Sequence, residues 1–278
     1  MTAAAERPFA RAVVGLAVAL TLVFSLLPFA WMVLTSFKSE SQVTAIPPVW
    51  LPTGGLRFYR IAIVDYGLFT FIGNSVLVAG ATVLVNLLLA TPAGYALSRL
   101  PVPGRRAWLA LLLIVSMFPQ VVIVGPVWEI LRSLGLLNTY AGLVIPYVAL
   151  TLPLSVWILA SFFRDLPPEL EESAKVDGCT GLGALCRVVL PVAVPGLFTA
   201  AILVFIYAWN EFFFALVVMT DPGRQTLPVG IALFQGEYTV PWGEMAAAST
   251  VATLPLVGLV LVFQKRIVSG LSAGAIKG

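Results

Sequence analysis

Six long stretches that are almost free of charged residues constrain the fold of this chain more than any other feature. They lie between Arg11 and Lys38, Asp65 and Arg99, Arg106 and Glu129, Arg132 and Arg164, Arg187 and Asp221, and Glu244 and Lys265. Only the fifth is interrupted, by Glu211. About 20 predominantly apolar residues in a helix cross the hydrocarbon core of a bilayer. Since the runs are too long and too unalternating for barrel strands, the sequence predicts an all-α polytopic membrane protein with six transmembrane helices.

Composition excludes the other broad classes of protein. The chain is 60% apolar and carries 16 Lys and Arg plus 13 Asp and Glu, whereas a soluble domain of this length would carry about 70 charges. It has no histidine, and the spacing of Cys179 and Cys186 is not that of metal ligands, so we expect no metal site and no catalytic residues. The net charge of +3 is spread out, which predicts a lipid environment and no nucleic-acid partner.

The distribution of basic residues predicts the direction of the spans. An even number of spans places both termini on one side, and that side holds 11 of the 16 Lys and Arg residues. Because basic residues concentrate in cytoplasmic loops, we expect both termini in the cytoplasm. The first run is too long for the apolar core of a cleavable signal peptide, which favours an uncleaved span. The predicted divisions are a cytoplasmic N-terminus at 1–11, a six-helix membrane domain at 12–268 with a cytoplasmic loop at 164–191, and a cytoplasmic tail at 269–278.

The predicted cytoplasmic loop is the one densely charged segment. Pro167 and Pro168 can open a helix where missing N–H groups cost nothing, three glutamates then oppose the positive end of the helix dipole, and Gly178 can adopt the left-handed conformation that ends a helix. The pattern predicts a short helix of about ten residues that stops at Gly178. By composition alone the loop could also be a solvated connector.

The spacing within this loop resembles the "EAA" loop, E-A-A-x3-G-x9-I-x-L-P, of bacterial ABC importer permeases. The matching positions are Glu172, Ser173, Ala174, Gly178, Val188, Leu190 and Pro191. The resemblance implies a coupling helix that docks into a cleft on an ATP-hydrolysing subunit. The implied contact residues are Glu171, Glu172, Ser173, Ala174, Asp177, Gly178, Leu190 and Pro191. Small residues would allow close approach, acids would offer anionic contacts, and Gly178 would make the turn.

Further motifs resemble the six-span subunit of maltose-type carbohydrate permeases. They are Asn74-Ser75, the run Ala93 to Arg99, Phe118-Pro119, the run Leu134 to Thr139, the run Trp209 to Phe212, and the end Gly270 to Gly278. The resemblance implies a type I ABC importer permease fold in the bacterial inner membrane and sugar import by alternating access. The implied partners are a homologous second permease, two ABC ATPase subunits, an extracytoplasmic sugar-binding protein and the sugar.

The same resemblance assigns the energy source and a second contact. Because the chain lacks a G-x-x-x-x-G-K-[ST] phosphate loop, we expect a non-catalytic subunit without a cofactor of its own, with ATP and Mg²⁺ bound by the partner ATPases. In relatives of this type the tail reaches toward the ATPase interface. The tail residues implied to make this contact are Gly270, Ser272, Gly274 and Lys277.

Glu211 is the only acid deep within a predicted span, and Asn210 precedes it. A carboxylate at mid-bilayer costs about 2.5 to 3.5 kcal/mol or more, so Glu211 should face protein or water. The pair is a candidate lining of the translocation path, and a helix–helix hydrogen bond is an equally good interpretation. A proton-coupled transporter using Glu211 and an intramembrane enzyme using Glu129 with Glu211 are the rival functions, but no internal repeat and no nucleophile–base pair supports either.

Overall fold

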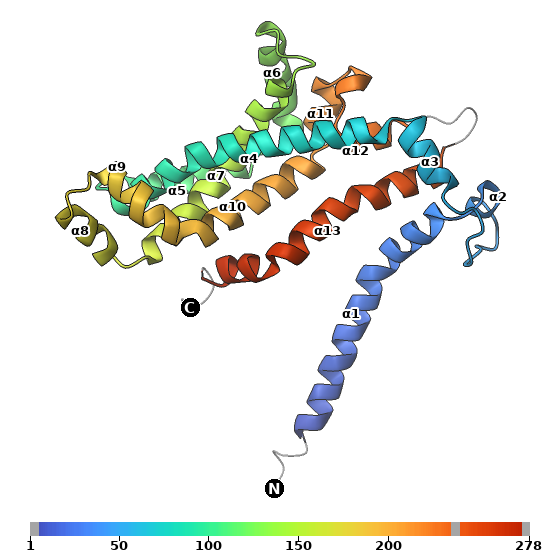
Figure 1. Cartoon of the computed structure of the whole chain (residues 1–278), viewed down its shortest axis with the longest axis horizontal. Helices are drawn as coiled ribbons and strands as arrows, with labels where there is room; N and C mark the ends of the chain where they lie inside the picture. The colour runs from blue at the N-terminus through green and yellow to red at the C-terminus, as the bar shows by residue number, and fades with distance from the viewer. Residues whose placement is uncertain (1–5, 235–239, 274–278) are drawn as a thin grey trace. The chain divides into compact units, whose positions relative to one another are not determined.

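The computed structural model describes residues 6–234 and 240–273, and every regular element in these ranges is helical (Figure 1). The all-α prediction is therefore confirmed for the described residues. The five longest helices are α1 (Glu6–Ser36), α4 (Leu68–Arg99), α7 (Tyr140–Asp165), α10 (Leu190–Asn210) and α13 (Trp242–Ala273). The shorter ones are α2 (Glu40–Val43), α3 (Arg57–Val64), α5 (Arg105–Ser116), α6 (Gln120–Ser133), α8 (Glu169–Val176), α9 (Gly181–Ala184), a π-helical turn η1 (Leu185–Val189), α11 (Phe213–Val218), a 3-10 turn η2 (Pro222–Arg224) and α12 (Leu227–Ala232).

Five helical segments among the described residues are long and apolar enough to cross a membrane, and a sixth span results if α5 and α6 are taken together. These two helices meet at an angle of 92°. Pro119 explains the break, because proline lacks an N–H donor and disfavours helical backbone in the residue before it. The predicted fifth span is also interrupted, since Glu211 has extended backbone between α10 and α11. The six predicted spans thus correspond to five long helical segments and one bent pair, and the charge-free run of the fifth also contains the break at Glu211.

The chain forms two compact units. One contains the described residues up to Leu68 together with Ile231–Leu254, and the other contains Phe69–Gly230 with α13 from Pro255 onward. In the first unit α3 and the start of α13 pack closely. The Phe58 ring occupies the space beside Gly243, where a Cβ atom would lie 2.2 Å from it.

The first unit also holds a buried cation that the sequence pattern does not predict. Lys38 follows α1 and is 2% exposed, with its ammonium 3.6 Å from the centroid of the Trp31 ring. Burial lowers the pKa of Lys38. Trp50 meets the Trp31 ring edge-on at 5.1 Å between centroids. This cation–π stack orders the segment that follows α1.

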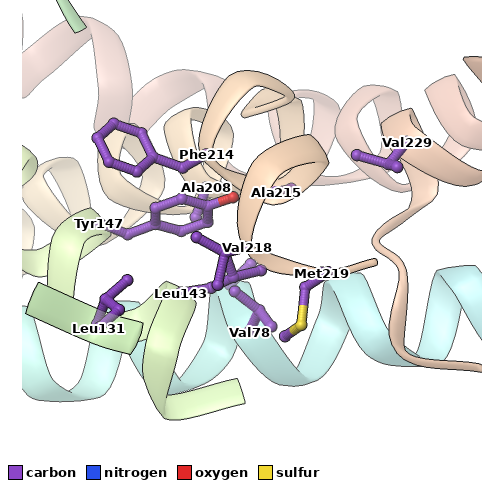
Figure 2. Close-up of a cluster of buried hydrophobic side chains, with 11 residues drawn as sticks. Val78, Leu131, Leu143, Tyr147, Ala208, Phe214, Ala215, Val218, Met219 and Val229 are labelled. Atoms are coloured by element: carbon purple, nitrogen blue, oxygen red, sulfur yellow. The ribbon is translucent and has the colours of Figure 1, made fainter. Parts of the chain in front are cut away.

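The second unit is built around α4, α7 and α10. One apolar cluster joins α4, α6, α7, α10, α11 and α12, and the side chain of Tyr147 from α7 points among those of α11 (Figure 2). A second cluster joins α4 and α7 to η1 and α10. Gly196 on α10 allows this helix to lie close to Phe162 on α7. A Cβ atom at Gly196 would lie only 2.6 Å from the Phe162 ring, so a larger residue would not fit without a shift. Asn86 on α4 donates a 2.8 Å hydrogen bond to Thr151 on α7, which adds a polar link inside the span.

Candidate functional site

The predicted coupling loop has the geometry that its sequence indicates. α8 runs from Glu169 to Val176, and Gly178 follows with φ of +81°. The Cys179 amide donates to the Ala174 carbonyl at 2.9 Å, which closes the end of the helix. The prediction of a short helix that stops at Gly178 is confirmed, with eight helical residues in place of about ten. The left-handed backbone at Gly178 then turns the chain toward α9.

The predicted contact residues of this loop differ in exposure. Glu172, Ser173, Asp177, Gly178 and Pro191 are exposed, and Glu171 and Leu190 are half-buried. Ala174, by contrast, is buried.

The exposed face of the loop also contains two apolar residues outside the predicted set. Val176 is 88% exposed and Leu182 is 73% exposed, on either side of the turn at Gly178. A lone apolar residue in a charged loop gives no distinguishing pattern, which is why the sequence alone does not single them out.

Glu171 points inward and joins the loop to two long helices. Its carboxylate accepts a 3.2 Å hydrogen bond from the Tyr95 hydroxyl and lies 3.4 Å from Nε of Arg99, and both side chains of this ion pair are 13% exposed. The Arg99 guanidinium also donates to the Phe163 carbonyl at 2.9 Å and to the Leu166 carbonyl. We name Tyr95, Arg99 and Glu171 the α4–α8 joint. It ties the end of α4 and the end of α7 to the first turn of α8.

The carboxylate of Glu211 is buried and fully engaged within the chain. It accepts hydrogen bonds from the Tyr147 hydroxyl at 2.5 Å, the Phe214 amide at 2.9 Å and the Ala215 amide at 3.2 Å. The side chain therefore caps α11 and anchors the break between α10 and α11 to α7. Of the two interpretations of Glu211, this geometry favours the hydrogen bond between helices.

Asn210 points differently from its neighbour. Its side chain is exposed, and its amide donates to the Ile206 carbonyl at 2.7 Å. It lines an open depression of about 390 Å³ together with Gln120 and Tyr207, which the sequence analysis does not select. Gln120 belongs to a different predicted span, so only the tertiary structure brings it to Asn210.

Two of the four predicted tail residues have described backbone. Gly270 and Ser272 lie within α13, which continues to Ala273, so the helix extends beyond the predicted start of the tail at 269. Gly274 and Lys277 lie outside the described residues. Within the described ranges no group of three Cys, Asp or Glu side chains is placed to hold a metal ion.

Residues 86–272 match the family described as binding-protein-dependent transport system inner membrane component. The chain belongs to this family. The match contains the joint, the loop, both broken spans and most of α13. The family assignment confirms the predicted resemblance to ABC importer permeases, and it identifies the chain as a multi-pass inner-membrane component of a transport system.

Similar proteins of known name cover this permease almost completely. It is 43% identical over 264 residues to the sulfoquinovosyl glycerol transport system permease protein SmoH of Agrobacterium fabrum, covering 95% of this chain and 93% of the relative. It is 43% identical over 259 residues to the trehalose/maltose transport system permease protein MalG of Thermococcus litoralis, covering 92% and 93%. A solved structure is also similar: it is a crystal structure of a bacterial ABC transporter involved in the import of the acidic polysaccharide alginate. One of its chains matches with a TM-score of 0.81 at 23% identity, covering 95% of this permease and 98% of that chain. This match confirms the fold.

The capping role of Glu211 predicts a measurable loss of stability. In Glu211→Gln one acceptor oxygen becomes an NH₂ group, so we expect a cost of about 1 kcal/mol, as for other lost caps. This corresponds to a fall of about 2 to 4 °C in the midpoint of thermal unfolding in detergent. The matched control is Glu129→Gln, because Glu129 is exposed. A Glu211→Gln protein with an unchanged midpoint and no transport would instead assign the carboxylate to the path.

Proposed function

We propose that this permease forms one half of the translocation path of an ATP-driven, binding-protein-dependent sugar importer. The named relatives carry trehalose, maltose or sulfoquinovosyl glycerol, and they support a sugar as the transported substrate. The other half of the path is a homologous second permease. Two ABC ATPase subunits bind ATP and Mg²⁺, and an extracytoplasmic binding protein delivers the sugar. Both termini lie in the cytoplasm, as the distribution of basic residues predicts.

The exposed turn of the loop carries this proposal. Val176 and Leu182 present apolar surface, while Glu172 and Asp177 present charge around Gly178. Exposed apolar residues surrounded by polar ones are typical of a docking surface. We therefore place the ATPase contact on α8 and the turn, with Ser173 and Pro191 at its edge. The C-terminal residues Gly270 to Lys277 form the second contact with the ATPases.

The α4–α8 joint gives the loop a route into the membrane domain. A shift of α8 is transmitted to Arg99 through Glu171, and from there to the carbonyls of Phe163 and Leu166 at the end of α7. Because α4 and α7 also share buried packing and the Asn86–Thr151 hydrogen bond, the two helices move together. When the two ATPase subunits close, they pull the loop, and this pull switches the permease between its two access states. Asn210, with the capped Glu211 behind it, lines the path.

The proposal is tested by purifying the complete transporter through a tag on this permease in mild detergent. We expect a second permease and an ATPase to remain bound. Val176→Asp should release the ATPase, because a charge replaces the most exposed apolar contact. Val64→Asp is the matched control, since Val64 is 68% exposed on α3, which belongs to the other unit.

Two results would contradict the proposal. One is a stable preparation without any ATPase that transports sugar down a proton gradient after reconstitution. The other is an ATPase that stays bound equally in Val176→Asp and in the control.

A further inference from the structure

Two broken spans of the second unit meet at the depression beside Asn210. Gln120 is the first residue of α6, directly after the break between α5 and α6, and Asn210 is the last residue of α10, directly before the break at Glu211. The Gln120 amide donates a 2.5 Å hydrogen bond to the Tyr207 hydroxyl, which bridges the two spans. The rest of the lining is Ile206, Glu211, Phe212 and Phe213.

The polar groups of this depression cannot face hydrocarbon. Asn210 is exposed, and its Oδ1 has no hydrogen-bond partner within the part of the chain that the structure describes. The same holds for Oε1 of Gln120. An unpaired amide oxygen in lipid costs several kcal/mol, and irregular backbone at membrane depth occurs only where it faces protein or a water-filled cavity. The depression therefore opens to water or to a polar partner.

The free groups match the chemistry of a sugar. Two amide oxygens can accept hydrogen bonds, and the Tyr207 hydroxyl, which accepts from Gln120, can donate its own proton outward. Phe212 is 37% exposed and offers an aromatic surface to the apolar C–H face of a pyranose ring. A volume of about 390 Å³ lies within the range of pockets for small ligands.

The charges of the depression select among sugars. Its lining contains no Lys or Arg, and its only carboxylic acid is Glu211, whose oxygens already accept three hydrogen bonds. An anionic sugar would meet a carboxylate with no cation to offset the repulsion. A neutral sugar would contact the hydrogen-bond acceptors, the hydroxyl donor and the aromatic surface of the depression without this repulsion.

We propose that Gln120, Tyr207 and Asn210 form a binding site through which this permease itself contacts the transported sugar, and that the site takes neutral sugars in preference to acidic ones. The inference rests on the proposed import function and adds the residues and the charge class of the substrate. The site lies beside two helix breaks, and binding sites at interrupted helices are also found in other transporters.

The test uses the complete transporter in lipid nanodiscs, in a Cys179→Ser, Cys186→Ser background. Single cysteines replace Ile206 or Phe213, which line the depression but are not among the three proposed ligands, and Leu84→Cys on α4 is the control because Leu84 is an apolar residue with 62% exposure. A charged, water-soluble methanethiosulfonate is added alone or with maltose, trehalose or glucuronic acid. We expect both site cysteines to react and the control to stay unmodified. Maltose or trehalose, each present at a concentration of roughly ten times its own dissociation constant, should slow the reaction about tenfold. Glucuronic acid should give no protection.

Three outcomes would overturn the inference. Unreactive cysteines at both positions would mean that protein covers the depression. Reactive cysteines without protection by either neutral sugar would mean a water-filled surface without a sugar site. Equal protection by glucuronic acid would remove the charge preference. Each is distinguishable from failure of the import proposal, because ATPase retention and binding-protein-dependent ATP hydrolysis are measured on the same preparation.

Discussion

Replacement of Arg99 by methionine should uncouple ATP hydrolysis from sugar transport. The guanidinium pairs with Glu171 and donates to the carbonyls of Phe163 and Leu166, and its side chain is 13% exposed. Its removal leaves a largely buried carboxylate without its cation, a change that costs about 3 to 5 kcal/mol in comparable pairs. We expect α8 to separate from α4 and α7 while the docking surface of the loop remains. The ratio of sugar molecules imported to ATP molecules hydrolysed should fall at least about tenfold in proteoliposomes.

Two further variants distinguish coupling from simple loss of structure. Tyr95→Phe removes one hydrogen bond to Glu171 and should lower the transport ratio only slightly. The double variant Arg99→Met, Glu171→Gln also removes the unpaired carboxylate. Its loss in the ratio of transport to hydrolysis should therefore be smaller than the sum of the losses in the two single variants. An Arg99→Met transporter with an unchanged ratio of transport to hydrolysis would refute the role of the joint.

Gly178→Val should release the ATPase and abolish transport. The backbone at Gly178 has φ of +81°, which a β-branched residue adopts only at a cost of about 1 to 3 kcal/mol. A Cβ at this position would meet no atom within 4 Å, so the loss arises from the backbone and not from crowding. The expected readout is co-purification of the ATPase with the tagged permease, together with sugar uptake.

The loop supplies its own controls for this substitution. A Cβ atom at Gly181 would also lie in open space, but this residue lacks a positive φ, so Gly181→Ala should retain the ATPase. Gly178→Asn should recover part of the function, because asparagine tolerates the left-handed region better than valine does. If Gly178→Val retained the ATPase and full uptake, the turn would not be part of the coupling surface.

Local sequence patterns predicted the helices and the turn of the loop correctly. Charge-free runs located the spans because membrane thickness sets the length of an apolar helix. Gly178 was identifiable because a glycine after an acidic first turn is a known helix end. The fold and the family also followed from motifs that lie in order along the chain, and the match over residues 86–272 confirms them.

The remaining features depend on contacts between distant residues. Glu171 lies among the acids of the loop by sequence, yet its partners come from 76 and 72 positions earlier. The pairing of Gln120 with Tyr207 joins residues 87 positions apart. No local period encodes such contacts. Ala174 was predicted to lie on the docking surface because small residues suit close approach, but its side chain is buried.

The cap at Glu211 has a consequence for biogenesis. A helix that begins at membrane depth exposes backbone amides, and a chain that relied on its partner for them would be unstable until assembly. Here the Glu211 carboxylate accepts from two of these amides, those of Phe214 and Ala215, within a single polypeptide. Newly inserted copies can therefore form the α10–α11 break before they assemble with any partner. Cells that synthesise this subunit in excess should accumulate it as a folded orphan, available for later assembly.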